Sequence, residues 1–87
     1  MKLIFAIVRD SDADPVTQGL TSADFRVTRV ASTGGLLRRG LTTLLIGLEA
    51  EQVEAAIQVF HKTCSPPSEG GKRATIFVIP VDRFEQI

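Results

Sequence analysis

Two stretches of the chain are apolar at nearly every position, and they restrict the fold more than any other feature. Lys2 to Val8 and Leu41 to Leu48 are short, rich in β-branched residues and bounded by charge or glycine, as buried strands are. Because successive residues of a strand point to opposite faces, both faces of these strands are apolar. A sheet built on them must therefore be covered on both sides.

The rest of the chain predicts two helices and two further strands. Asp14-Pro15 is typical of a helix start, and an apolar face at helical spacing follows it as far as Ala23. A second, clearer helix is predicted over Glu51 to Thr63, with acidic residues at its start and basic residues at its end. The remaining elements are a strand over 25–31, a loop over 32–40, a loop over 64–73, a strand over 74–80 and a tail over 81–87.

The predicted order is β-α-β-β-α-β in one domain, residues 1–87. Right-handed crossovers then give an α+β, ferredoxin-like sandwich, with a four-stranded antiparallel sheet and two helices on one face. Two helices cover only one of the two apolar faces. We therefore expect subunits to pack their uncovered faces together in a homo-oligomer, with a homotrimer as the expected form.

Composition excludes several partners and compartments. Ten basic and ten acidic side chains give a formal net charge of zero, which argues against nucleic-acid binding and against electrostatic attachment to a membrane. No apolar run approaches the roughly 20 residues of a membrane helix. Cys64 is the only cysteine, so neither an internal disulfide nor a two-cysteine metal site can form. The expected location is the cytoplasm.

The segment from Arg26 to Gly40 carries the chemistry that suggests a ligand. Gly34 and Gly35 allow backbone N–H groups to converge on an anion. Four arginines suited to phosphate contacts surround them, namely Arg26, Arg29, Arg38 and Arg39. An ordinary glycine-containing connection with solubilising arginines explains the same residues, and the residues alone leave both interpretations open.

Catalysis and metal binding find no support in the residue pattern. His61 is the only histidine, and near a helix end it complements the helix dipole. Cys64 has no identifiable base, and Asp10, Asp12 and Asp14 lack the glycine and closing glutamate of a calcium loop. An RNA-binding domain of this topology needs aromatic residues on its central strands, which are mostly aliphatic here. We therefore expect no enzyme, no metal and no cofactor.

The stretch FRVTRVASTGGLLRRGLTTLLIG, from Phe25 to Gly47, closely resembles the PII-like cyclic-di-AMP receptor family. The opening MKLIFAIV and the closing ATIFVIPVDRFEQI resemble it too. The resemblance implies a PII-like signalling protein: a homotrimer that binds a nucleotide second messenger between subunits and regulates a protein target. The implied ligand is cyclic-di-AMP or another adenine nucleotide.

The resemblance also implies which residues form the ligand pocket. Its strand, loop and C-terminal positions correspond here to Arg26, Thr28, Leu37, Gly47 and Gln86, and the glycines of its loop motif to Gly34 and Gly35.

Some positions of the same pattern depart from the family. Leu36 stands where the family has phenylalanine, Leu41 where it has asparagine, and Asp24 where it has asparagine, and the loop over 64–73 is shorter. Leu36 removes an aromatic face for adenine, and Leu41 removes a hydrogen-bonding group. The alternative function is therefore a trimeric interaction module that works without the ligand.

Overall fold

A computed structural model describes residues 1–30, 40–66, 71 and 73–87 of the chain. Four strands form one sheet in the order β2-β3-β1-β4, and every neighbouring pair is antiparallel. The strands are β1 (Lys2–Arg9), β2 (Thr28–Val30), β3 (Leu41–Leu48) and β4 (Ala74–Pro80). The helices are α1 (Asp10–Ser22) and α2 (Val53–Thr63), the latter preceded by the short 3-10 helix η1 (Ala50–Gln52). This is the ferredoxin-like α+β fold that the sequence predicts.

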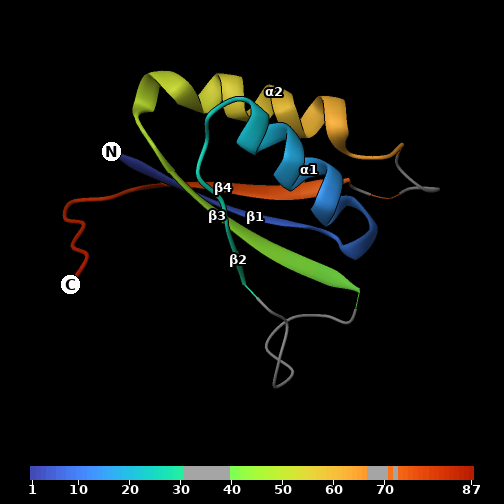
Figure 1. Cartoon of the computed structure of the whole chain (residues 1–87), viewed down its shortest axis with the longest axis horizontal. Coiled ribbons are helices and arrows are strands. Elements are labelled where there is room, and N and C mark those ends of the chain that lie inside the picture. The colour runs from blue at the N-terminus through green and yellow to red at the C-terminus, as the bar shows by residue number, and fades with distance from the viewer. Residues whose placement is uncertain (31–39, 67–70, 72) are drawn as a thin grey trace.

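The two helices lie side by side on one face of the sheet (Figure 1). On that face β1 buries Ile4, Ala6 and Val8 completely or almost so. β3 adds Leu44, Ile46 and Leu48, and the helices close the core with Val16, Leu20, Ala56 and Phe60. Burial of this apolar surface is the main favourable contribution to folding.

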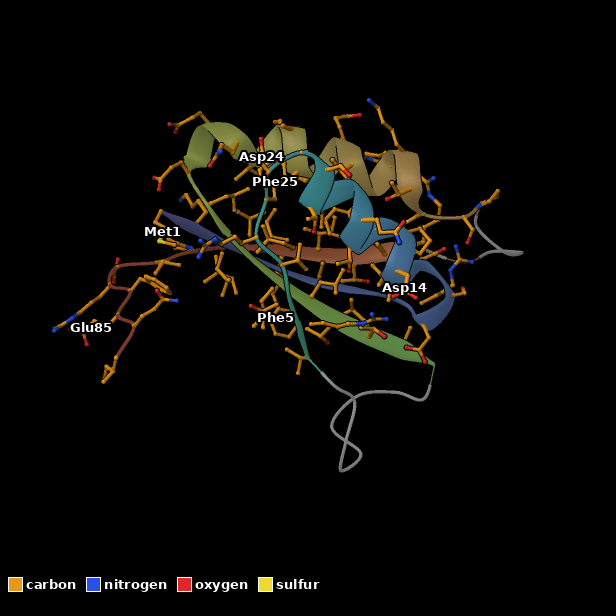
Figure 2. The ribbon with its side chains drawn as sticks, in the orientation of Figure 1. Met1, Phe5, Asp14, Asp24, Phe25 and Glu85 are labelled. Carbon is orange, nitrogen blue, oxygen red and sulfur yellow. The ribbon has the colours of Figure 1, made fainter. Side chains whose placement is uncertain are left out.

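The other face of the sheet carries apolar side chains without helices over them. Residues 3, 5 and 7 of β1 are half-buried, whereas their neighbours under the helices are fully buried. Phe5 packs edge to face against Phe77 of β4, with ring centroids 6.3 Å apart. Phe77 and Ile79 expose 52% and 42% of their surface. Figure 2 shows Phe5 on the side of the sheet turned away from the helices.

Helix α1 begins at Asp10, four residues before the predicted start at Asp14. The backbone N–H of Asp10 donates to the Gly40 carbonyl at 2.8 Å, and the Thr42 hydroxyl donates to the Asp10 carboxylate. These contacts fix the turn directly after β1. Pro15 is then inside the helix, where its ring faces solvent and only the carbonyl of exposed Ser11 loses a donor.

Strand β2 is shorter than predicted, because residues 25–27 do not join the ladder. The N–H of Phe25 donates to the Leu20 carbonyl at 2.9 Å, which ties this residue to the end of α1. The predicted alternation nevertheless holds: Phe25 is buried and Val27 packs on the core, whereas Arg26 and Thr28 are exposed.

Candidate functional site

A pocket of about 480 Å³ opens on the uncovered face of the sheet, where β1 begins and β3 ends. Ten residues line it: Met1, Lys2, Leu3, Arg26, Thr28, Leu45, Gly47, Val81, Phe84 and Gln86. Pockets for drug-sized ligands span about 300–1,000 Å³. The volume therefore suits a small molecule, or part of a larger one.

Strand pairing accounts for the floor of this pocket. Leu3 pairs with Gly47, and Thr28 pairs with Leu45, so three strands bring these side chains to one face. Arg26 precedes Thr28 by two residues and points to the same side. The sheet therefore supports two polar side chains, Arg26 from just before β2 and Thr28 from its first position, on an apolar base.

The C-terminal tail forms the opposite wall. The N–H of Val81 donates to the Met1 carbonyl at 3.1 Å, which fixes the tail where it leaves β4. From there the tail runs past the first residues of the chain, and Figure 2 places Met1 and Glu85 at the same end of the molecule. Phe84 and Gln86 of this tail reach the pocket.

Four of the predicted site residues meet in this pocket: Arg26, Thr28, Gly47 and Gln86. They come from the segment before β2, from β2, from the end of β3 and from the tail, so only folding brings them together. Leu41 is at the other end of β3, opposite Arg9, and does not line the pocket. Gly34, Gly35, Leu36 and Leu37 lie outside the described residues, as do Arg38 and Arg39.

Gly47 leaves space that a side chain would take. A Cβ atom at this position would come 3.1 Å from the Cε atom of Met1. Any larger residue would have to displace that methionine or extend into the pocket. Glycine therefore allows a ligand to approach the strand backbone closely.

The charge on the pocket wall is positive. Arg26 and Lys2 both line it. Within the described part of the chain, neither forms an ion pair, whereas Arg83 of the tail is paired with Glu85 at 2.6 Å. Asp24 is not among the lining residues. The pocket therefore presents two cationic groups to an anionic ligand.

Arg29 does not join Arg26, although the sequence suggested that the two surround one anion. Its guanidinium forms a 2.7 Å ion pair with Asp14 of α1. The strand pairing explains this direction. Arg29 pairs with Leu44, and Leu44 faces the helices. The strand alternation that turns Arg26 toward the pocket turns Arg29 away from it.

A second, smaller cavity of about 130 Å³ lies between α2 and β4. His61, Cys64 and Arg73 are its polar or ionisable lining residues. Burial raises the pKa of the Cys64 thiol, and the nearby Asp12 carboxylate acts in the same direction. The thiol therefore stays protonated at neutral pH, which makes it a poor nucleophile. Arg73 contacts both Nδ1 and the carbonyl of His61 at 3.0 and 3.3 Å.

Sequence reasoning missed the contribution of Phe84. The residue belongs to an irregular tail, where neither helical nor strand periodicity indicates a direction. The sequence did contain one signal for Phe84. It lies two residues before Gln86, and alternate residues of an extended segment point to the same side. Met1, Lys2 and Val81, which also line the pocket, were missed as well.

In the described ranges, no group of three or more His, Cys, Asp or Glu side chains is placed to hold a metal ion. None of the helices in those ranges is both long and apolar enough to cross a bilayer.

Comparison with known proteins identifies the family. Residues 1–69 match the family model of the cyclic-di-AMP receptor. The fold also matches a crystal structure of a functionally unknown protein from Pediococcus pentosaceus ATCC 25745, with a TM-score of 0.77 and 33% sequence identity. That match covers 99% of this chain and 96% of the other. The chain therefore belongs to the cyclic-di-AMP receptor family.

Proposed function

We propose that this protein is a PII-like signal-transduction protein that binds cyclic-di-AMP, or another adenine nucleotide, and regulates a protein partner. One observation carries the proposal: Arg26, Thr28, Gly47 and Gln86, which the family resemblance assigns to the ligand, line one pocket. The protein acts by binding rather than by catalysis. It works in the cytoplasm, where its single cysteine stays reduced.

Each of the four residues has a role that its chemistry supports. The guanidinium of Arg26 pairs with a phosphate through two parallel hydrogen bonds. The Thr28 hydroxyl donates to a phosphate or ribose oxygen. The Gln86 amide offers both a donor and an acceptor to the edge of an adenine. Gly47 has no side chain, so the ligand can lie directly against the backbone of β3.

The proposal places the pocket between subunits of a homotrimer. The chain is one domain, residues 1–87, and a domain of this size gains stability from association. Its uncovered sheet face exposes Phe77, Ile79 and Val30. The pocket opens on the same face, so a neighbouring subunit that covers the sheet also closes the pocket.

A trimeric interaction module without a ligand is the second candidate. Leu36 and Leu41 favour it, because they stand where the family pattern has an aromatic residue and a hydrogen-bonding residue. The apolar sheet face supports a trimer whether or not a nucleotide binds. In that case partner binding is independent of every nucleotide.

Calorimetric titration of the purified protein tests the proposal. The panel is cyclic-di-AMP, ATP, ADP, cyclic AMP and cyclic-di-GMP, with the mass in solution measured on the same sample. We expect saturable binding of an adenine nucleotide at one ligand per subunit of a trimer. A trimer that binds none of the five at millimolar concentration contradicts the sensor and supports the interaction module.

A further inference from the structure

Phe84 is an aromatic side chain on the wall of the pocket with no assigned role. The chain has five phenylalanines and no tryptophan or tyrosine. Phe25 and Phe60 belong to the core, and Phe5 packs on Phe77. Phe84 exposes 61% of its surface and lines the pocket beside Arg26 and Gln86. Of the five rings, it is the one on the pocket wall.

The arrangement of the tail keeps this ring directed at the pocket. Arg83 and Glu85 form an ion pair with each other at 2.6 Å and do not line the pocket. The alternate residues, Phe84 and Gln86, both line it. At its start the tail is held by the hydrogen bond from Val81 to Met1. Within residues 83–86, the Arg83 and Glu85 side chains therefore lie on one side of the tail, and the Phe84 and Gln86 side chains on the other.

The pocket wall therefore combines three kinds of group that a nucleotide needs. Arg26 supplies a cation for phosphate, Gln86 an amide for a base edge, and Phe84 a π-face for the base itself. Aromatic side chains stack on nucleobases of any identity, because every base has a π-face. Leu36, in contrast, supplies no aromatic face at the position where the family has one.

We propose that Phe84 is the residue on which an adenine base of the ligand stacks, so that the C-terminal tail supplies the aromatic contact that Leu36 lacks. This inference rests on the proposed nucleotide-binding function and assigns a specificity-determining residue within it. The ring selects a ligand with an aromatic base over one that offers only phosphate and sugar.

The test uses the full-length chain and cyclic-di-AMP as the probe. Phe84→Leu keeps an apolar side chain of similar size and removes the π-face. We expect it to weaken binding by about 5- to 150-fold, the range that loss of one stacked base implies. Ile87→Ala is the matched control, because Ile87 is a fully exposed apolar residue of the same tail and does not line the pocket. Its affinity should equal that of the wild type.

A second variant gives a fluorescence signal that would not change if residue 84 had only a structural role. Phe84→Trp introduces the only tryptophan of the chain, so its fluorescence reports the environment of residue 84 alone. Stacking predicts retained affinity, with fluorescence quenched by cyclic-di-AMP and unchanged by ribose 5-phosphate at the same concentration.

The outcomes distinguish failure of the stacking role of Phe84 from failure of the nucleotide-binding function. If the wild type binds and Phe84→Leu binds equally well, the stacking role is wrong while the nucleotide-binding function stands. If Phe84→Leu lowers the mass in solution at unchanged affinity, Phe84 anchors a subunit interface, and stacking is again wrong. If the wild type binds no adenine nucleotide, both the function and the stacking role fall.

Discussion

Gly19 is a point at which α1 lies directly against α2. A Cβ atom there would lie 2.8 Å from Cγ2 of Thr63 and 2.9 Å from Cγ1 of Val59. Both neighbours are β-branched and stiff. The Thr63 hydroxyl also donates to the Val59 carbonyl at 2.6 Å, which holds its methyl group toward Gly19. Glycine has a low helix propensity and by itself weakens α1. The packing of α1 against α2 nevertheless requires it at this position.

Gly19→Ala should lower the free energy of unfolding. Overpacking costs about 1–3 kcal/mol, and the gain in helix propensity returns only about 1 kcal/mol. Urea denaturation measures the difference. Adding Thr63→Ser removes the nearer methyl group while keeping the hydroxyl, so the double variant should recover part of the loss. A Gly19→Ala protein as stable as the wild type contradicts the close approach.

Asp12 is a buried carboxylate that joins three parts of the fold. It is 2% exposed and accepts hydrogen bonds from the backbone N–H of Ser65 at 3.1 Å, the Ser65 hydroxyl at 2.7 Å and Nε of Arg9 at 3.1 Å. Burial alone acts to raise the pKa of Asp12, but the bonds from Ser65 and the charge of Arg9 outweigh it. The pKa of Asp12 is therefore below its ordinary value of 3.8.

The lowered pKa of Asp12 predicts a loss of stability in acid. A carboxyl whose pKa is lower in the folded than in the unfolded state stabilises fully above its unfolded pKa, near 3.8. That contribution is lost as the pH falls through the folded pKa. Asp12→Asn should reduce the free energy of unfolding at pH 7 by about 1–3 kcal/mol. The difference from wild type should shrink below pH 4.

Asp14→Asn is the matched control for this titration. Asp14 lies on the same helix and pairs with Arg29, but the two side chains are 77% and 46% exposed. An exposed pair contributes about 0–1 kcal/mol. Urea midpoints at pH 7, 5, 4 and 3 should therefore separate the two variants. Equal effects of both substitutions at pH 7 argue against the role of Asp12.

At the scale of the elements, β1, β3 and β4 followed the sequence more closely than β2 and the start of α1 did. β3 and β4 have the predicted bounds, because apolar runs between glycine, charge and proline leave little choice of ends. Asp14-Pro15 resembled a helix start, yet α1 begins at Asp10 through hydrogen bonds to Gly40 and Thr42. Those partners are about 30 residues away, so local signals could not reveal them.

The 3-10 helix η1, which leads directly into α2, begins with a reciprocal cap. The Glu49 side chain accepts from the backbone at Gln52, and the Gln52 side chain accepts from the Glu49 N–H at 2.9 Å. The predicted start at Glu51 is close to the observed one, because acidic residues at a helix N-terminus are a local signal.

Removing this cap should destabilise the protein modestly. Gln52→Ala loses one half of the reciprocal pair and should cost about 0.5–1 kcal/mol of unfolding free energy. The control is Gln58→Ala on the exposed middle of α2, which should change the urea midpoint little. Equal midpoints for the Gln52→Ala protein and the wild type contradict the capping role.

At the scale of the whole molecule, the sequence predicted on which face of the sheet a residue lies better than it predicted which residues line the pocket. Strand alternation placed Arg26 and Thr28 on the side away from Phe25, and the structure agrees. Alternation could not show that the tail returns past Met1 and brings Phe84 and Gln86 to the same place. The route of an irregular segment depends on contacts such as the one between Val81 and Met1.

The uncovered, apolar sheet face predicts that chains associate through it. Phe77→Glu places a charge on that face and should shift the mass in solution from that of the proposed homotrimer toward that of one chain. Val78→Glu is the control, because Val78 is similarly exposed on the same strand but points to the side of the helices. Light scattering after gel filtration measures both. A Phe77→Glu protein that keeps the mass of the wild type contradicts assembly through this face.

Titration of cyclic-di-AMP into three proteins, namely the wild type, Arg26→Ala and Arg29→Ala, measures whether this pocket binds the nucleotide. Arg26 lines the pocket, whereas Arg29, three residues on, pairs with Asp14 on the other side of the sheet. Loss of a phosphate-binding arginine should weaken binding by about tenfold or more, since a charge-assisted hydrogen bond contributes about 1.5–3 kcal/mol. We expect this loss in Arg26→Ala and wild-type affinity in Arg29→Ala. Equal affinities in all three proteins, or no binding by the wild type, would contradict it.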